Sequence, residues 1–433
     1  MRYLTTLVSI GWILLIMAAA MLLPVITAAY TGDQTTLGVF AGTAVLTAFF
    51  GGASLFAGRG RLKEPARREA LILPVLAWVV TPVFAAPPFI LTGSVDTLAQ
   101  AYFEAVSGFT TTGATVIGNL SEVPSAILLW RALLQWLGGF ATLAMAISFF
   151  VVLNIGGMSL FNNRLPHGEG DRLTDRVRGV VLSLWWIYLL ISGLCLLLLW
   201  LVGTPTFEAL CLTFSTISTG GFMPREGTLA DYGNPAIPII LMPFMLIGAI
   251  NFTLHWAALE GRLKAYRRDP ELRTMWIIVL IATALFTTGL LTGLGQGKGS
   301  EAWNEGLMDG LFAAISTVST TGYISAREMS FPLTPALVIL PLLVIGGCSG
   351  STTGGLKIMR LRILLKYGAR EMARLSHPHG VVPQDYGTRG LSDDLMSAVW
   401  AFFILYVLLI CFSTLALSLL GLDLQAAISA VTT

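Results

Sequence analysis

Three short stretches rich in threonine and glycine repeat one pattern along the chain. They span residues 106–114 (copy 1), 214–222 (copy 2) and 315–323 (copy 3). Each carries serine at its second place, a hydroxyl residue at its fifth, threonine at its sixth and glycine at its eighth. Such residues supply carbonyl and hydroxyl oxygens without a fixed charge, which suits the coordination of a monovalent cation. The copies contain no Asp or Glu, which argues against a calcium-type filter.

The composition is that of a polytopic membrane protein. Of the 433 residues, 55% are hydrophobic and only 12% are charged, whereas soluble domains carry about 25% charged residues. Apolar runs of roughly 20 residues, the length that crosses a bilayer, recur along the chain. We therefore predict an all-α fold.

A unit of four parts recurs around the copies: a span, a short approach segment, the Thr-Gly stretch and a returning span. The predicted domains are an N-terminal two-helix unit (1–58), pore unit 1 (69–155), pore unit 2 (179–260), pore unit 3 with a broken second helix (274–375) and an incomplete pore unit 4 (394–433). The predicted returning spans cover 126–153 and 237–259, and a third begins at residue 333. The approach segments cover about 96–105, 205–217 and 305–318, and 423–433 looks like a fourth.

The approach segments are too short to span a bilayer, so we interpret them as re-entrant half-helices. The Thr-Gly stretches then run as non-helical backbone at membrane depth, which is tolerated only when it is buried in protein or lines a water-filled cavity. Each half-helix would aim its partly negative carboxyl end at that cavity. The alternative is that these stretches are helix-packing surfaces, but such surfaces recur every four residues and the copies are contiguous.

The basic residues predict the topology. All but four of the 26 Lys and Arg residues fall in segments that would lie on one side; the exceptions are Arg131, Arg225, Lys298 and Arg327. Because basic residues mark the cytoplasmic side, we predict an N-terminus in the cytoplasm and copies entered from outside.

A glycine loop, residues 346–355, interrupts the third returning span. Five glycines in ten residues do not make a simple membrane helix, since each costs up to about 1 kcal/mol in a helix interior. We interpret the loop as a gate below the copies, with Lys357 close behind; a structural kink is the alternative. The predicted gate residues are Gly346, Gly347, Gly350, Ser351, Thr352, Thr353, Gly354, Gly355 and Lys357.

The copies resemble the filter loops of the Trk/Ktr/HKT potassium-uptake superfamily, and the segment from Trp130 to Gly139 is similar to the second helix of that family's first unit. The resemblance covers essentially the whole chain, and the extra N-terminal helix pair points to the TrkH/TrkG branch. It implies a channel-like potassium importer with four non-identical units and an intramembrane gating loop. The ion-coordinating residues it implies are Thr111, Thr112, Gly113, Thr219, Gly220, Gly221, Thr320, Thr321 and Gly322.

Two departures from the family pattern stand out. Phe140-Ala141 follows Gly138-Gly139 where the family has Met-Gly, which puts little in doubt. Residues 427–433 align with 314–320, so the glycine of a fourth copy would fall two residues after Thr433. We expect the natural gene product to continue through a fourth filter and one more span.

The resemblance implies a bacterial inner-membrane location, a homodimer, and a cytoplasmic nucleotide-binding ring subunit (TrkA-like) as regulator. The polar segments 162–178, 262–273 and 366–394 are where such a regulator would dock. Membrane lipid is the other expected partner. The transported ion is expected to be potassium. We predict neither nucleic-acid binding nor an organic cofactor.

Five further polar residues lie in the approach segments and returning spans. For Glu104, Glu208 and Asp309 we expect stabilisation of the first turn of the half-helices and attraction of cations at the outer mouth. Arg131 and Asn251 are polar residues in returning spans and functional candidates for that reason; for Arg131 the alternative is a position at the membrane interface.

Two other functions compete with the pore. One is a secondary transporter of a small solute that uses the broken helix as its binding site, which predicts inverted repeats rather than the single orientation seen here. The other is a membrane-embedded enzyme, which is disfavoured because no catalytic set converges. Whether sodium or protons are coupled stays open.

Overall fold

The structure, a computed structural model, describes residues 4–58, 67–153, 173–293, 300–324, 333–376, 385–386, 389–390 and 393–432. In these ranges the regular secondary structure is helical, apart from a two-residue ladder in which β1 (Asp385–Tyr386) pairs antiparallel with β2 (Arg389–Gly390). The basic stretch 59–66, loop residues 162–172, Lys298 and Arg327, all used in the topology prediction, lie outside the described residues.

The chain forms two compact units. The first comprises Met1–Leu153 and Tyr188–Gly227, and the second comprises Asn154–Ile187 and Thr228–Thr433. Copies 1 and 2 belong to the first unit, whereas copy 3 and the glycine loop belong to the second.

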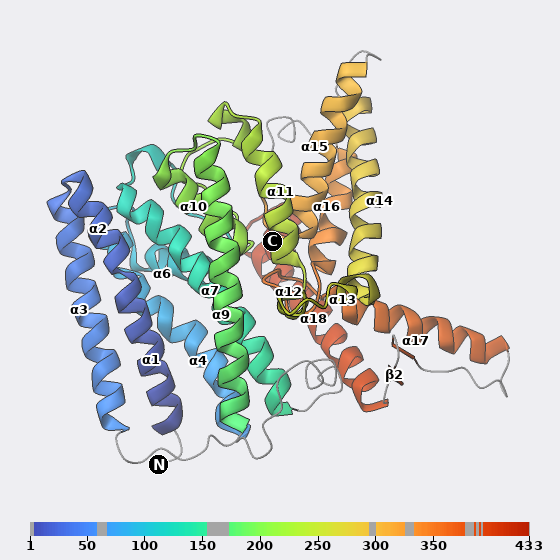
Figure 1. Cartoon of the computed structure of the whole chain (residues 1–433), viewed down its shortest axis with the longest axis horizontal. Coiled ribbons are helices and arrows are strands. Elements are labelled where there is room, and N and C mark those ends of the chain that lie inside the picture. Colours follow the sequence, from blue (N-terminus) through green and yellow to red (C-terminus); the bar gives the residue numbers. More distant parts are fainter. Residues whose placement is uncertain are drawn as a thin grey trace. The chain divides into compact units, whose positions relative to one another are not determined.

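The helices of the first unit follow the predicted order (Figure 1). They are α1 (Leu4–Ala20), α2 (Leu22–Thr31), α3 (Gln34–Ala57), α4 (Arg67–Ala85), α5 (Pro87–Leu91), α6 (Leu98–Phe109), the 3-10 turn η1 (Leu120–Glu122), α7 (Ser125–Leu153), the later part of α9 (Leu173–Leu201) and α10 (Thr206–Ile217).

The second unit contains the remaining elements. They are the 3-10 turn η2 (Leu229–Tyr232), α11 (Ala236–Ala249), α12 (Phe252–Leu259), α13 (Lys264–Arg268), α14 (Pro270–Gly293), α15 (Ser300–Val318), α16 (Leu333–Ile345), α17 (Ile358–Ser376), α18 (Asp393–Leu419) and α19 (Leu424–Thr432). Figure 1 shows α17 extending sideways from the rest of its unit.

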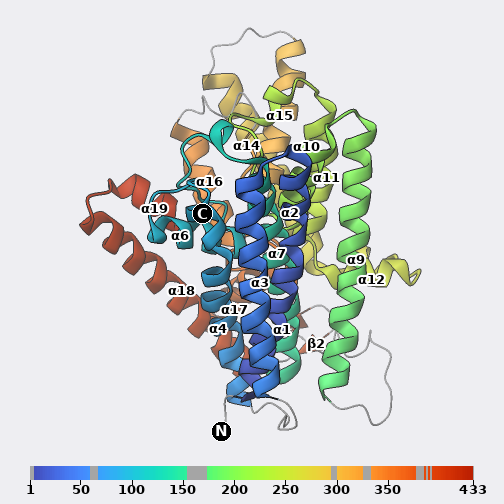
Figure 2. The ribbon, with the colours of Figure 1, turned by 90° about the vertical axis from the view of Figure 1, so that its left-hand side faces the viewer.

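Seven of the described helical segments are long and apolar enough to cross a membrane, and the bent pair α11 and α12 would make eight. The N-terminal pair is built by close helix packing: α1, α2 and α3 run alongside one another in Figure 2. A Cβ atom on Gly11 would lie 2.9 Å from the carbonyl oxygen of Gly51, so the two glycines allow α1 and α3 to touch. The turn between α2 and α3 uses Gly32 in the left-handed region and Asp33 as the N-cap of α3.

Helix α7 is the centre of the first unit. In its apolar window 78% of the residues are buried, compared with 6% for α18. The side chains of Trp130 and Arg131 are among the largest that are fully buried, and the Trp130 indole donates to the carbonyl oxygen of Ala85 at 3.0 Å. This helix therefore supports the two copies that the unit contains.

Two of the predicted elements are wrong in detail. The returning span predicted at 237–259 is broken, because α11 and α12 meet at a bend of 100° around Ile250 and Asn251. The third approach segment, predicted to begin at residue 305, is instead the longer helix α15, which begins at Ser300. The first two approach segments are the 12-residue helices α6 and α10, as expected.

Candidate functional site

Each Thr-Gly copy begins by ending a helix in the same way. The amide of the sixth residue donates to the carbonyl of the third, and the amide of the seventh donates to the carbonyl of the second, at 2.9–3.1 Å in all three copies. This is the Schellman motif, whose terminating residue adopts the left-handed conformation and is usually glycine. Here it is threonine, with φ of 59° at Thr111, 54° at Thr219 and 53° at Thr320.

A β-branched residue in this conformation is an outlier that must be held by its surroundings. Because the same outlier occurs at the sixth place of all three copies, the left-handed threonine is a shared structural feature of the copies. Outliers of this kind cluster at functional sites.

The eighth-place glycines also have positive φ, with values of 78°, 80° and 78° at Gly113, Gly221 and Gly322. The intervening seventh residues are absent from the positive-φ set, so φ alternates in sign along each copy. Successive carbonyls of an ordinary strand point to opposite sides. An alternation in φ turns successive carbonyls toward a common side, which is the arrangement that can replace the water shell of an ion.

Hydroxyl groups brace the copies from behind. The second-place serine donates across the loop to the ninth-place carbonyl, Ser107 to Ala114 at 2.5 Å and Ser316 to Tyr323 at 2.7 Å. Copy 2 lacks this direct bond, because Ser215 donates instead to the Gln135 side chain at 2.8 Å.

Copies 1 and 2 are in contact. A Cβ atom on Gly113 would lie 2.2 Å from the carbonyl oxygen of Gly220, so the two backbones meet without a side chain between them. Helix α7 packs against both: a Cβ atom on Gly138 would lie 1.9 Å from the Phe109 carbonyl oxygen, and one on Gly139 would lie 2.8 Å from the Ser218 Cβ. Two adjacent glycines of α7 thus bring the ends of α6 and α10 together.

A buried ion pair lies beside copies 1 and 2. The Glu104 carboxylate accepts from Arg131 Nε at 2.7 Å, and the two side chains are 0% and 2% exposed. Glu104 also accepts from the Thr115 hydroxyl at 3.0 Å and from the Val116 amide at 3.1 Å, just after copy 1. The Arg131 guanidinium lies 4.1 Å from the centre of the Phe222 ring in copy 2.

The expectations for Glu104 and Arg131 were therefore wrong. Glu104 lies in the middle of α6 rather than in its first turn, and it faces protein rather than an outer mouth. Arg131 is buried rather than interfacial. A short-range sequence argument missed the pair because its partners are 27 residues apart.

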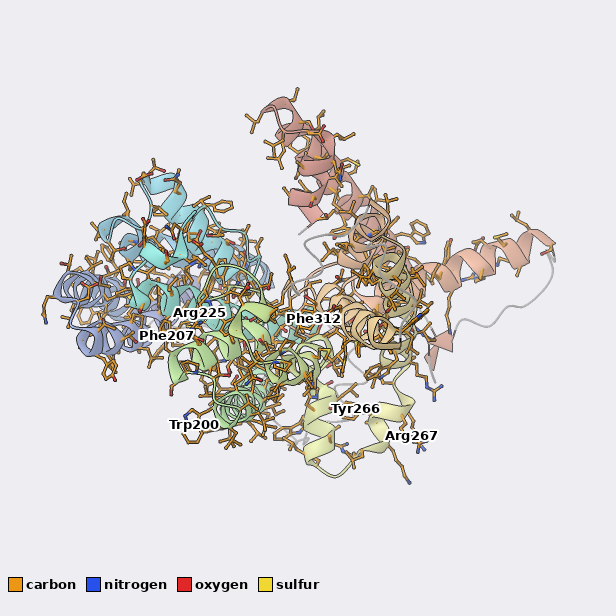
Figure 3. All side chains as sticks on the ribbon, turned by 90° about the horizontal axis from the view of Figure 1, so that it is seen from above. Trp200, Phe207, Arg225, Tyr266, Arg267 and Phe312 are labelled. Carbon is orange, nitrogen blue, oxygen red and sulfur yellow. The ribbon has the colours of Figure 1, made fainter. Side chains whose placement is uncertain are left out.

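The other two acidic residues differ from each other. Glu208 lies in the first turn of α10, as predicted, and pairs with Arg225, which is half exposed. Figure 3 labels Arg225 and Phe207, the neighbour of Glu208. Asp309 lies in the middle of α15, so the prediction of a first-turn position was wrong for it.

The glycine loop joins α16 to α17 and folds back on itself. The amides of Leu356 and Lys357 donate to carbonyls at the end of α16, at 2.8 and 2.9 Å. A Cβ atom on Gly346 would lie 2.2 Å from the Gly354 carbonyl oxygen, so only glycine fits where the two ends of the loop meet. The Lys357 ammonium donates to the Ser351 hydroxyl at 3.2 Å and to Thr353.

The loop also interlocks with the break between α11 and α12. The Cys348 amide donates to the Ala249 carbonyl at 2.9 Å, the Thr352 amide donates to the Gly248 carbonyl at 3.1 Å, and the Phe252 amide donates to the Gly350 carbonyl at 3.0 Å. Backbone groups that each interruption would leave unpaired inside a membrane are thus satisfied by the other interruption. Asn251 caps α12 by accepting from the Thr253 amide at 2.9 Å.

Two further contacts hold the glycine loop. The buried Glu271 carboxylate of α14 accepts from the Ser349 amide at 2.7 Å. The Gly354 amide donates to the Thr320 hydroxyl at 3.1 Å, which joins the loop to the strained threonine of copy 3. The predicted gate residues and copy 3 are therefore brought together, as are copies 1 and 2 in the other unit.

The described residues contain no cluster of three or more His, Cys, Asp or Glu side chains that could hold a metal ion. The donors available at the copies are carbonyl and hydroxyl oxygens, which suit a weakly held alkali cation in transit. Gln135 is the residue of this region that sequence reasoning missed. It was visible as a polar residue inside the apolar run of α7, which is the available signal for a functional side chain in a membrane segment.

Comparison with known proteins supplies the context. The TrkH family, described as cation transport proteins, matches residues 36–433. The chain belongs to this family. It is 34% identical over 438 residues to the Trk system potassium uptake protein TrkH of Salmonella typhimurium, covering 98% of this chain and 87% of that protein.

Related proteins and one solved structure agree with this assignment. The TrkH protein of Escherichia coli K12 is 36% identical over 86% of this chain and 76% of its own length, and TrkG of the same organism is 30% identical over 97% and 86%. The crystal structure of the potassium transporter TrkH from Vibrio parahaemolyticus matches with a TM-score of 0.88 at 33% identity, covering 100% of this chain and 89% of that one. The predicted family and fold class are confirmed: this TrkH-family chain is an all-helical, multi-span membrane protein.

Proposed function

We propose that this chain carries potassium ions into the cell through a pore whose selective wall is the backbone of the Thr-Gly copies. The observation that carries the proposal is the alternation of φ from Thr to Gly, repeated in all three copies. Membership of the TrkH family supports it, as do the names of the relatives, which are potassium uptake proteins.

The ion would be held by the sixth, seventh and eighth residues of each copy, the nine residues named from the resemblance. The carboxyl ends of α6 and α10 lead directly into copies 1 and 2, and a helix end of this kind carries roughly half a negative charge. The buried pair of Glu104 and Arg131 adds no net charge to this wall, so attraction of the cation comes from dipoles rather than a fixed carboxylate.

The glycine loop would be the gate. The Gly354 amide of the loop donates to the Thr320 hydroxyl of copy 3, and the loop is also hydrogen-bonded to the break between α11 and α12 and to Glu271 of α14. The glycine loop and the segment between α11 and α12 are both interruptions of helices. At such places a small rotation of α12 or α17 would exchange hydrogen bonds without unfolding a helix. Opening would require this interlock to be released.

For the cellular setting we propose the bacterial inner membrane, with the N-terminus in the cytoplasm, a homodimer, and a nucleotide-binding ring subunit as regulator. The short helix α13 carries Arg267 and Arg268 in its last turn and offers a charged surface in one of the predicted docking segments. Tyr266 and Arg267 of this helix are labelled in Figure 3.

Flux measurements on the purified full-length protein in liposomes test the pore. We expect potassium-dependent uptake of rubidium that is abolished by Gly113→Ala, because the added Cβ would lie 2.2 Å from the Gly220 carbonyl. Gly118→Ala is the matched control, since a Cβ there meets nothing within 4 Å. Transport of a small solute without any alkali-cation flux would favour the secondary transporter and overturn the proposal.

Deletion of residues 347–354 tests the gate. The variant should fold and show a larger open fraction in the same liposomes. Unchanged or lost flux in a folded variant would contradict a gating role.

A further inference from the structure

Copy 2 departs from its two sister copies at the seventh place. Copies 1 and 3 have threonine there, and its hydroxyl lies 2.7 Å from Thr110 in copy 1 and 2.8 Å from Ser319 in copy 3, in each case the fifth-place hydroxyl. Copy 2 has Gly220 at this place and so lacks that bond. It also lacks the direct bond between the second-place serine and the ninth-place carbonyl, so two of the bonds that brace its sister copies are missing.

The side chain of Gln135, which comes from α7, occupies the space. A Cβ atom on Gly220 would lie 2.4 Å from the Gln135 Cδ atom, so the glutamine amide lies where a seventh-place side chain would begin. The Gln135 side chain is fully buried. It makes three hydrogen bonds to copy 2: Oε1 accepts from the Ser215 hydroxyl at 2.8 Å and from the Phe222 amide at 3.2 Å, while Nε2 donates to the Gly220 carbonyl at 2.7 Å.

We propose that Gln135 is a positioning residue that replaces the missing seventh-place side chain of copy 2 and fixes the Gly220 carbonyl in the wall of the pore. Gly220 and Gln135 form a matched pair, because the glycine leaves the room that the glutamine fills. A carbonyl oxygen has two lone pairs, so the Gly220 carbonyl keeps one for an ion while Gln135 Nε2 holds its direction. The pairing of Gly220 with Gln135 does not depend on transport, whereas its effect on ion preference rests on the proposed function.

The hydrogen bonds fix the orientation of the amide. Both groups facing Oε1 are donors and the group facing Nε2 is an acceptor, so a reversed amide would place oxygen against the Gly220 carbonyl and NH₂ against the Phe222 amide. Glutamate in this place would set a carboxylate oxygen against the same carbonyl. Methionine would keep the length of the side chain and lose all three hydrogen bonds.

The matched pair is tested by a double substitution read out by folding alone. Gly220→Thr should abolish the monodisperse peak of the detergent-purified protein, because the threonine collides with Gln135. Gln135→Ala should lower the yield of folded protein by leaving buried groups unpaired. The double variant should recover much of the yield lost in Gly220→Thr, since it rebuilds the pattern of copies 1 and 3. A double variant no better than Gly220→Thr would overturn the pairing.

Ion preference tests the positioning role. Gln135→Met should lower the preference for potassium over sodium in liposome flux by roughly tenfold, the factor expected from loss of the one hydrogen bond, of the three it removes, that holds the Gly220 carbonyl. Gln135→Glu should lower the preference further. Gln100→Met is the matched control, because the Gln100 side chain also makes hydrogen bonds, at the start of α6, but touches no copy. That control should lower thermal stability and leave the ion preference unchanged.

The outcomes separate the two proposals. A wild-type full-length protein that folds but moves no alkali cation would overturn the proposed function. The folding test of the matched pair would not be affected by that result. An unchanged potassium preference in a folded, active Gln135→Met variant would overturn the positioning role and leave the pore intact. Equal loss of preference in Gln100→Met would show a general effect of stability and would also overturn it.

Discussion

Breaking the buried pair of Glu104 and Arg131 should cost more stability than breaking the half-exposed pair of Arg225 and Glu208. Arg131→Met removes the cation and leaves a carboxylate that is 0% exposed, although it keeps its hydrogen bonds from Thr115 and Val116. Breaking a buried pair in this way costs about 3–5 kcal/mol. With an unfolding entropy of about 2.1 cal/mol/K per residue, this corresponds to a fall of about 3–5 °C in Tm for a chain of this length.

A second substitution should return most of that loss. In the double variant Arg131→Met/Glu104→Gln the buried carboxylate becomes a neutral amide, whose oxygen can still accept from Thr115 and Val116. Because the cost of the single substitution comes mainly from an uncompensated charge, removing the charge should raise Tm again. Thermal unfolding in detergent, followed by the size-exclusion profile of the folded protein, measures both steps.

The chain supplies its own control. Arg225 pairs with Glu208 next to copy 2, but Arg225 is half exposed and solvent screens the interaction. Arg225→Met should therefore cost less than about 1 kcal/mol. Equal effects of Arg131→Met and Arg225→Met, or a double variant less stable than Arg131→Met, would refute the reasoning.

Three further substitutions follow from single contacts. Thr111→Gly should raise the free energy of unfolding by about 0.5–1 kcal/mol, because it relieves left-handed strain at the expense of some chain entropy; chemical or thermal unfolding that shows a loss would contradict this. Gly138→Ala should prevent folding, since its Cβ would lie 1.9 Å from the Phe109 carbonyl, whereas Gly193→Ala, which meets nothing within 4 Å, should fold at wild-type yield. Asp33→Ala should cost about 1 kcal/mol through the lost N-cap of α3. Hydrogen bonds from Thr36 lower the pKa of Asp33, so this stabilisation is complete above the ordinary pKa of aspartate and disappears as pH falls through the lowered value; melting curves of both proteins should converge in acid and diverge at neutral pH.

The sequence predicted the elements that repeat or that have a strong local signature. The copies were found from residue type and spacing, the helices α6 and α10 from their shortness, and the break after α16 from its glycines. Each of these signals lies within a dozen residues.

The break between α11 and α12 was not predicted because nothing in its own sequence requires it. Residues 236–259 are mostly apolar and contain two prolines, Pro238 in the first turn of α11 and Pro243 inside it, neither of which lies at the bend. The bend is stabilised from outside, by hydrogen bonds from the glycine loop about a hundred residues later. A reading of local propensity cannot detect a break whose unpaired groups are satisfied by a distant segment.

The three copies have the same backbone conformation, but different residues of the rest of the chain hold each of them in place. All three share the left-handed threonine and glycine, but each is held by different side chains: Glu104 behind copy 1, Gln135 behind copy 2 and the glycine loop beside copy 3. Four identical subunits would have to use one support for every wall. Because one chain encodes all the copies, each copy can have its own support, so copy 3 is joined to the glycine loop while copy 2 is held by a buried side chain of α7. Under the proposed function, copy 3, whose Thr320 hydroxyl accepts from the Gly354 amide, is the wall where a change in the glycine loop would first alter ion coordination.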